Sequence, residues 1–177
     1  MDRRLLTITG ISLVISMVYT SHDVMATEPT FASRQIARAH QLIEMWLECI
    51  ECDQGELKGV ATLGALVTPS LIATLKAGPS QAKREIMRLH LKGSYKRLTE
   101  YKHTHHANAP TESESEYVAH YLNNYHAQYQ IRAAIALAEI GGPTAKQAIE
   151  EALATPLRKD VEHVLKELKE KLGKPSP

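Results

Sequence analysis

The two cysteines of the chain stand three positions apart, in the stretch Cys49-Ile-Glu-Cys52. Thiols at this spacing form a disulfide-exchange centre, attach haem, or supply half of a zinc site. Asp53 follows where haem attachment needs a histidine, and no second cysteine pair completes a zinc site. An exchange centre also places its thiols at a helix N-terminus, whereas these lie near the C-terminal end of the helix expected over 30–52. We therefore expect a structural disulfide between Cys49 and Cys52, ahead of two free buried thiols and ahead of redox catalysis.

Histidines form the second group of residues with possible chemistry. The run KHTHH at 102–106 puts His103 and His106 on one face if the helix persists, and the sequence places three more not far away, at His90, His120 and His126. The run borders a polar loop and has no Asp, Glu or His partners at a strict ligand spacing. We expect a solvated helix end and no metal, with a zinc or copper site as the weaker alternative.

Four tyrosines recur at every fourth position, as Tyr117, Tyr121, Tyr125 and Tyr129. A step of four residues advances about 400° around a helix, so the rings drift by about 40° per step and cover a broad face. They therefore cannot all be equally buried. The rings fill the core, with their hydroxyls on water or carbonyls, or they form a partner-binding face. Both hold if one part of the row is buried and another faces a partner, so these four are the candidate partner-binding residues.

The elements that carry these residues belong to a single domain of ordinary composition. The 177 residues are 44% hydrophobic and 23% charged, which is enough for one buried core. The 21 basic and 20 acidic side chains leave a net charge of +1. Such a balance provides no general field for nucleic acid or an anionic membrane, so we expect neither as a partner.

The N-terminus has the pattern of a secretory signal. Arg3 and Arg4 precede an apolar run over 5–19, and small residues end at Ala26. We expect a signal peptide at 1–26 and a mature domain at 27–177, exported to the periplasm or the outside of the cell. The alternatives are an uncleaved anchor and a buried core helix, but the run is short for a membrane span. After cleavage we expect no stable membrane insertion.

Helical spacing covers nearly all of the mature chain, and no window alternates apolar and polar residues for long enough to form a strand. Caps and breakers divide it: Thr68 and Pro69 start a helix, and Gly78-Pro79 ends it. The first three expected helices are about 30–52, 56–64 and 68–77. A fourth runs from 80 to a polar loop at 107–115, and three more follow at 116–140, 143–154 and 156–172. The connections are short, so successive helices lie antiparallel. The fold class is therefore all-α, a short α-solenoid of helical hairpins.

An internal repeat supports the solenoid. The segment at 61–75 matches the one at 135–149 in phase, with Pro69 against Pro143, Leu71 against Ala145 and Leu75 against Ile149. The offset of 74 residues is about two helical hairpins. The stretch RAAIALAEIGGPTAKQAIEEAL at 132–153 resembles the HEAT-repeat family, especially its phycobilisome-lyase-like short form. In such a stack the alanines permit close packing of neighbouring hairpins, while the Gly-Gly-Pro turn reverses the chain.

The resemblance implies binding of partners rather than catalysis. HEAT-like proteins bind along an extended concave groove, and no convincing catalytic set is present in this chain. We expect a non-catalytic scaffold for a protein or peptide in the cell envelope, with no cofactor. One alternative is a periplasmic ligand or metal binder that uses the histidine- and tyrosine-rich middle segment. The other is a lyase-like chromophore-attachment factor, because some short-repeat relatives are bilin lyases.

Overall fold

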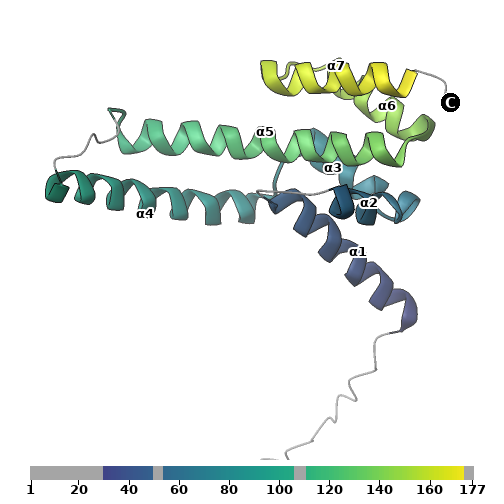
Figure 1. Ribbon diagram of the computed structural model, residues 1–177, viewed down its shortest axis with the longest axis horizontal. Coiled ribbons are helices and arrows are strands. Elements are labelled where there is room, and N and C mark those ends of the chain that lie inside the picture. Colours follow the sequence, from purple (N-terminus) through teal and green to yellow (C-terminus); the bar gives the residue numbers. More distant parts are fainter. Residues whose placement is uncertain (1–29, 50–53, 106–110, 174–177) are drawn as a thin grey trace, which may run out of the picture.

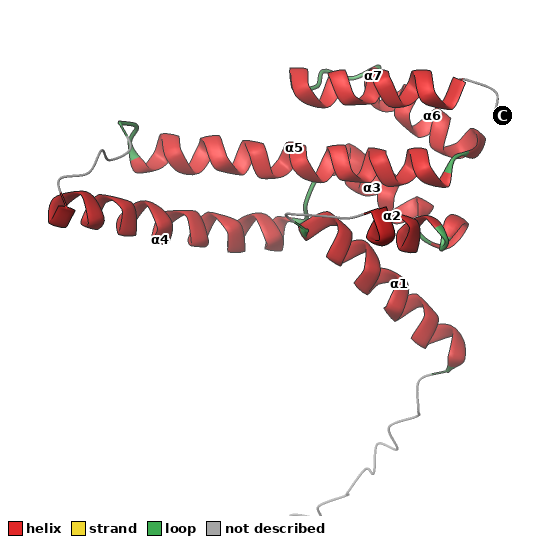
Figure 2. Ribbon diagram, in the orientation of Figure 1, coloured by secondary structure: helices red, strands yellow, loops and turns green. Residues whose placement is uncertain are grey.

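The computed structural model describes residues 30–49, 54–105 and 111–173, without the side chains of 102–105. Every regular element in these residues is a helix, which confirms the all-α class (Figure 2). The expected signal peptide lies outside the described residues. The helices are α1 (Phe31–Glu48), α2 (Gln54–Ala61), the 3-10 turn η1 (Gly64–Leu66), α3 (Thr68–Ala77), α4 (Gln81–His105), α5 (Glu114–Ile140), α6 (Gly142–Leu153) and α7 (Lys159–Gly173).

The helix boundaries agree with the expected ranges at some ends and depart from them at others. The Thr30 side chain accepts a hydrogen bond from the backbone N–H of Ser33 and caps α1. The predicted end of this helix at 52 is wrong, because α1 stops at Glu48 and Cys49 is extended. The predicted start of α5 at 116 is also wrong. Ser113 and Glu116 form a capping box, which starts the helix at Glu114.

The centre of the fold is α5, which packs against α1, α2, α3, α4, α6 and α7 (Figure 1). Its C-terminal half consists largely of small residues, and Ala133, Ala134 and Ala136 are completely buried. Small side chains let the backbones of neighbouring helices approach closely around one helix. The sequence interpretation of the alanine-rich stretch as a packing face is therefore correct.

The N-terminal half of α5 extends beyond this core and lies along α4, forming a two-helix arm (Figure 1). A second, smaller core holds the arm together, with Leu91 on α4 and Tyr117 and Val118 on α5 buried. Tyr95 closes the arm near its tip, since its hydroxyl donates to the carbonyl of Glu112 at 3.0 Å. Of the tyrosine row, Tyr117 thus belongs to the core of the arm, whereas Tyr129 belongs to the main core and Tyr125 packs against it.

The two segments related by 74 residues have the same local structure in their second halves, which are α3 and α6. Their first halves differ, since 62–67 consists of turns and η1 whereas 135–140 is the end of α5. Both α3 and α6 begin with a proline in the first turn. The matched positions Leu71 and Ala145 are buried, and so are Leu75 and Ile149. Each helix therefore presents equivalent positions to the core.

Replacing Ala136 with leucine is expected to lower the free energy of unfolding by about 1–3 kcal/mol. Ala136 is completely buried, so the larger side chain has to displace its neighbours. Urea denaturation would measure the loss. The matched control is Ala119→Leu, at an exposed position of the same helix. Equal stabilities of the two variants would show that the alanine face is not tightly packed.

Candidate functional site

The structure divides the tyrosine row by burial. Tyr129 is 2% exposed and Tyr117 is 8% exposed, whereas Tyr121 is 43% exposed and Tyr125 is half-buried. The ring of Tyr117 stacks at a tilt on Tyr121, with centroids 4.5 Å apart. Core packing therefore accounts for Tyr117 and Tyr129. Tyr121 is exposed enough to contact a partner, and so, in part, is Tyr125.

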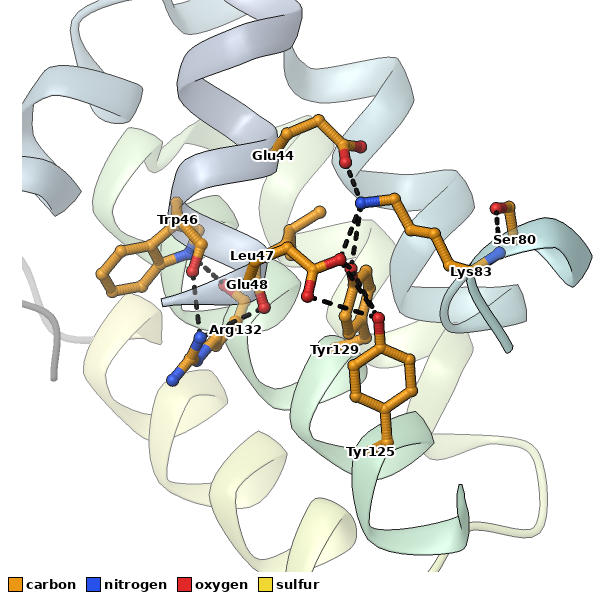
Figure 3. A network of polar contacts seen from close by, with 9 residues as sticks. All are labelled: Glu44, Trp46, Leu47, Glu48, Ser80, Lys83, Tyr125, Tyr129 and Arg132. Carbon is orange, nitrogen blue, oxygen red and sulfur yellow. Dashed lines mark hydrogen bonds and ion pairs between the residues drawn. The ribbon is translucent and has the colours of Figure 1, made fainter. Parts of the chain in front are cut away.

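A polar network joins the tyrosines to two other helices (Figure 3). Glu48, the last residue of α1, accepts hydrogen bonds from the hydroxyls of Tyr129 and Tyr125, the latter at 3.1 Å. Lys83, in the first turn of α4, donates to Glu48 at 2.8 Å and also pairs with Glu44. The tyrosine hydroxyls are 3.2 Å apart. The network ties the ends of α1 and α4 to the middle of α5.

Arg132 explains why α1 ends where it does. Its guanidinium donates to the carbonyls of Trp46 at 3.3 Å and Leu47 at 3.1 Å, which are orphan acceptors of the last turn. In return, the indole N–H of Trp46 donates to the carbonyl of Arg132 at 3.0 Å. A cation at a helix C-terminus also interacts favourably with the helix dipole. Residues 86 positions apart in the sequence thus set the end of α1 (Figure 3).

The charge states of the network are fixed at neutral pH. Burial alone raises the pKa of Glu48, but hydrogen bonds from Lys83 and Tyr129 and the charge of Lys83 outweigh it and lower that pKa. Burial alone lowers the pKa of Lys83, but the bonds and charges of Glu44 and Glu48 raise it. Burial and the bond to Glu48 raise the pKa of Tyr129 far above its ordinary value. None of the three therefore changes charge near neutral pH, so the arrangement positions helices rather than transferring protons.

Beside this network lies a hollow of about 420 Å³. It is lined by Glu48, Lys83 and Tyr125 on the network side and by Ile86, Met87 and His90 of α4. We call these six residues, together with Tyr121, one turn before Tyr125 on α5, the tyrosine seam. The surface is partly apolar, because Ile86 is 68% exposed.

Glu48, Lys83 and Arg132 were not identified from the sequence. Their only local signal is weak: Glu44 and Glu48 stand four positions apart at the end of the α1 stripe. Such a pair is usual on a solvated helix face. Nothing in the sequence near Glu48 indicates the tyrosines, which lie 77 and 81 positions away.

The expected disulfide stays a prediction. Cys49 occupies the C-cap position of α1 in an extended conformation, and its Sγ lies 3.4 Å from Oε2 of Glu56. Cys52 lies outside the described residues. The C-terminal location of Cys49 matches the position expected for the motif.

The histidines are spread over the molecule. His90 and His120 are exposed on the arm, and His126 is half-buried on α5. His106 lies outside the described residues, as do the side chains of the rest of the 102–106 run. Within the part of the chain that the structure describes, no three His, Cys, Asp or Glu side chains are grouped so that they could hold a metal ion.

His126 borders a cavity of about 650 Å³ that the sequence did not indicate. The cavity lies between α3, α5, α6 and the connection to α7. Its polar lining includes Lys76, His126, Gln130, Glu151 and Arg158. This cavity and the tyrosine seam are the sites within the described residues from which the proposals below are argued.

Comparison of the chain with family models, with curated proteins and with solved structures gives no match. Every helix within residues 30–49, 54–105 and 111–173 is too short or too polar to cross a membrane.

Replacing Glu48 with glutamine is expected to remove a pH-dependent part of the stability. A carboxyl group whose pKa is lowered on folding stabilises the protein above its unfolded pKa, and this contribution disappears as the pH falls through the folded pKa. The difference in free energy of unfolding between wild type and Glu48→Gln should therefore be constant between about pH 6 and pH 9. It should shrink as the pH falls below the ordinary value of 4.5. Urea denaturation across this range would measure it, and a difference that persists unchanged in acid would contradict the network.

Proposed function

We propose that this protein is a non-catalytic helical scaffold that binds a protein or peptide partner along the tyrosine seam. The helices form a short α-solenoid of the HEAT type in this proposal. The equivalent burial at Leu71 and Ala145, and at Leu75 and Ile149, supports the repeat. The signal-like segment at 1–26 supports a location in the periplasm or outside the cell.

The observation that carries the proposal is an exposed aromatic ring on a rigid base. Tyr121 is 43% exposed, yet its ring packs at a tilt on Tyr117 and stacks on His120, the latter at a centroid distance of 5.2 Å. A tyrosine held in this way offers contact area and a polar tip at little cost in rotamer entropy.

The walls of the hollow beside Tyr125 are also held in place by hydrogen bonds. Glu48 and Lys83 hold the hydroxyls of Tyr125 and Tyr129, so the walls of the hollow do not have to be ordered when a partner binds. The exposed Ile86 extends this surface with an aliphatic side chain. Rigid tyrosines beside a hollow are typical of the central residues of protein interfaces, where Trp, Tyr and Arg are enriched.

Replacing Tyr121 with alanine is expected to weaken partner binding by about 1 kcal/mol or more, since it removes an exposed anchor. The partner would first be captured from an envelope extract with the domain and purified. Its affinity for wild type and Tyr121→Ala would then be measured by calorimetry.

The matched control is Phe31→Ala, which removes another exposed ring, 71% exposed, at the N-terminal end of α1 far from the seam (Figure 1). Binding should be unchanged in this variant. Equal affinities of wild type and Tyr121→Ala would place the recognition surface elsewhere.

A further inference from the structure

We propose that the cavity beside His126 binds a small organic anion, a carboxylate carried on a short apolar body. This site is separate from the tyrosine seam and does not depend on the proposed partner. It rests on the shape of the cavity, the charges around it, and the position of His126.

The cavity has the size and the mixed lining of a small-molecule site. Its volume of about 650 Å³ lies in the usual range for such sites, roughly 300 to 1,000 Å³. Leu75, Ala127 and Leu157 provide apolar walls. The side-chain amide of Gln130 is already hydrogen-bonded, since it donates to the carbonyl of Leu75 at 3.0 Å. The apolar body of a ligand can therefore cover the apolar walls, while polar groups of the cavity remain available to its carboxylate.

The charges around the cavity leave one cation unmatched. Lys76 of α3 pairs with Glu151 of α6 at 2.9 Å, and Arg158 pairs with Asp160 at the start of α7. Arg84 of α4 has no side-chain partner among the described residues. The charged residues of the lining itself are Lys76, Arg158 and Glu151, with a sum of +1. Arg84 lies outside the lining, but its charge also acts on His126. A carboxylate is the ligand group that this excess favours.

His126 is held in place with its ring nitrogens unused. The ring lies directly over the backbone of Gly78, so closely that a Cβ at position 78 would overlap it. No described residue makes a hydrogen bond with this imidazole. Burial lowers its pKa, and the charges of Arg84 and Arg158 lower it further. The ring is therefore a neutral group in a positive environment, which can donate one hydrogen bond to an anion.

Titration of the full-length mature domain with hexanoate tests the proposal, with His126 observed by NMR of its ring protons. We expect saturable binding, a rise in the pKa of His126 on binding, and tighter binding as the pH falls through that pKa. Hydrogen bonds from their partners lower the pKa values of Glu151 and Asp160, and the bond to Asp160 raises the pKa of Arg158. These three groups therefore keep their charges in this range, and the change is assigned to His126. Hexylammonium and hexanamide, which have the same chain, should bind at least about tenfold more weakly.

Variants locate the site. Arg84→Gln should weaken hexanoate binding by about fivefold, because it removes the unmatched charge without breaking a described contact. Arg34→Gln, at an exposed position of α1, is the matched control and should bind as wild type does. The proposal is overturned if the shifts do not saturate, if hexylammonium binds as well as hexanoate, or if Arg84→Gln equals wild type. None of these results bears on the partner proposed for the tyrosine seam.

Discussion

Replacing Tyr129 with alanine is expected to lower the free energy of unfolding by about 3–5 kcal/mol. The side chain is 2% exposed and belongs to the main core, so its removal leaves a cavity there. The same change removes the hydroxyl that bonds Glu48 and lies 3.2 Å from the ammonium of Lys83. Both losses act at the junction of α1, α4 and α5. Urea or guanidinium denaturation would measure the effect.

Tyr121→Ala is the matched control on the same helix. Tyr121 is exposed, so its removal should change stability by less than about 1 kcal/mol. Tyr129→Phe separates the two contributions, since it keeps the ring and removes only the hydroxyl, with an expected cost of about 1–2 kcal/mol. Similar losses in Tyr129→Ala and Tyr121→Ala would contradict the division of the tyrosine row into core and surface residues.

Replacing Gly78 with alanine is expected to cost about 2–4 kcal/mol, through two separate effects. Gly78 has φ 67° and ψ −153°, a conformation that is almost restricted to glycine. In addition, the new methyl group would overlap the ring of His126. Thermal or denaturant unfolding would measure the total.

The chain offers a control that contains only the first effect. Gly141 has nearly the same conformation, with φ 72° and ψ −163°, and a Cβ there would meet nothing within 4 Å. Gly141→Ala should therefore cost only the backbone strain, about 1–3 kcal/mol. The additional loss in Gly78→Ala measures the contact with His126 and should be smaller in the background of His126→Ala. If the two glycine variants are equally destabilised, the ring is free to move away.

Local residues were enough to predict most of the helices. Thr30 caps α1, Pro69 lies in the first turn of α3, and Gly78 ends that helix, each through geometry that involves only a few neighbouring residues. Gly142, with φ 81°, permits the reversal between α5 and α6 as expected. The end of α1 was predicted four residues too late, because Arg132 satisfies its last carbonyls from another helix.

The sequence by itself determined that this chain is helical, where most of its helices begin and end, and that its alanine-rich stretch is a packing face. These properties depend on caps, turns and the 3.6-residue period, which act within one or two turns of a helix. Only the tertiary structure decided which tyrosines are buried, which charges meet, and where the cavity beside His126 lies. A row of rings that drifts by about 40° per step has no preferred inward member until neighbouring helices cover part of it. Glu48 and Tyr129 are 81 positions apart, and only the packing of α1 on α5 brings them together.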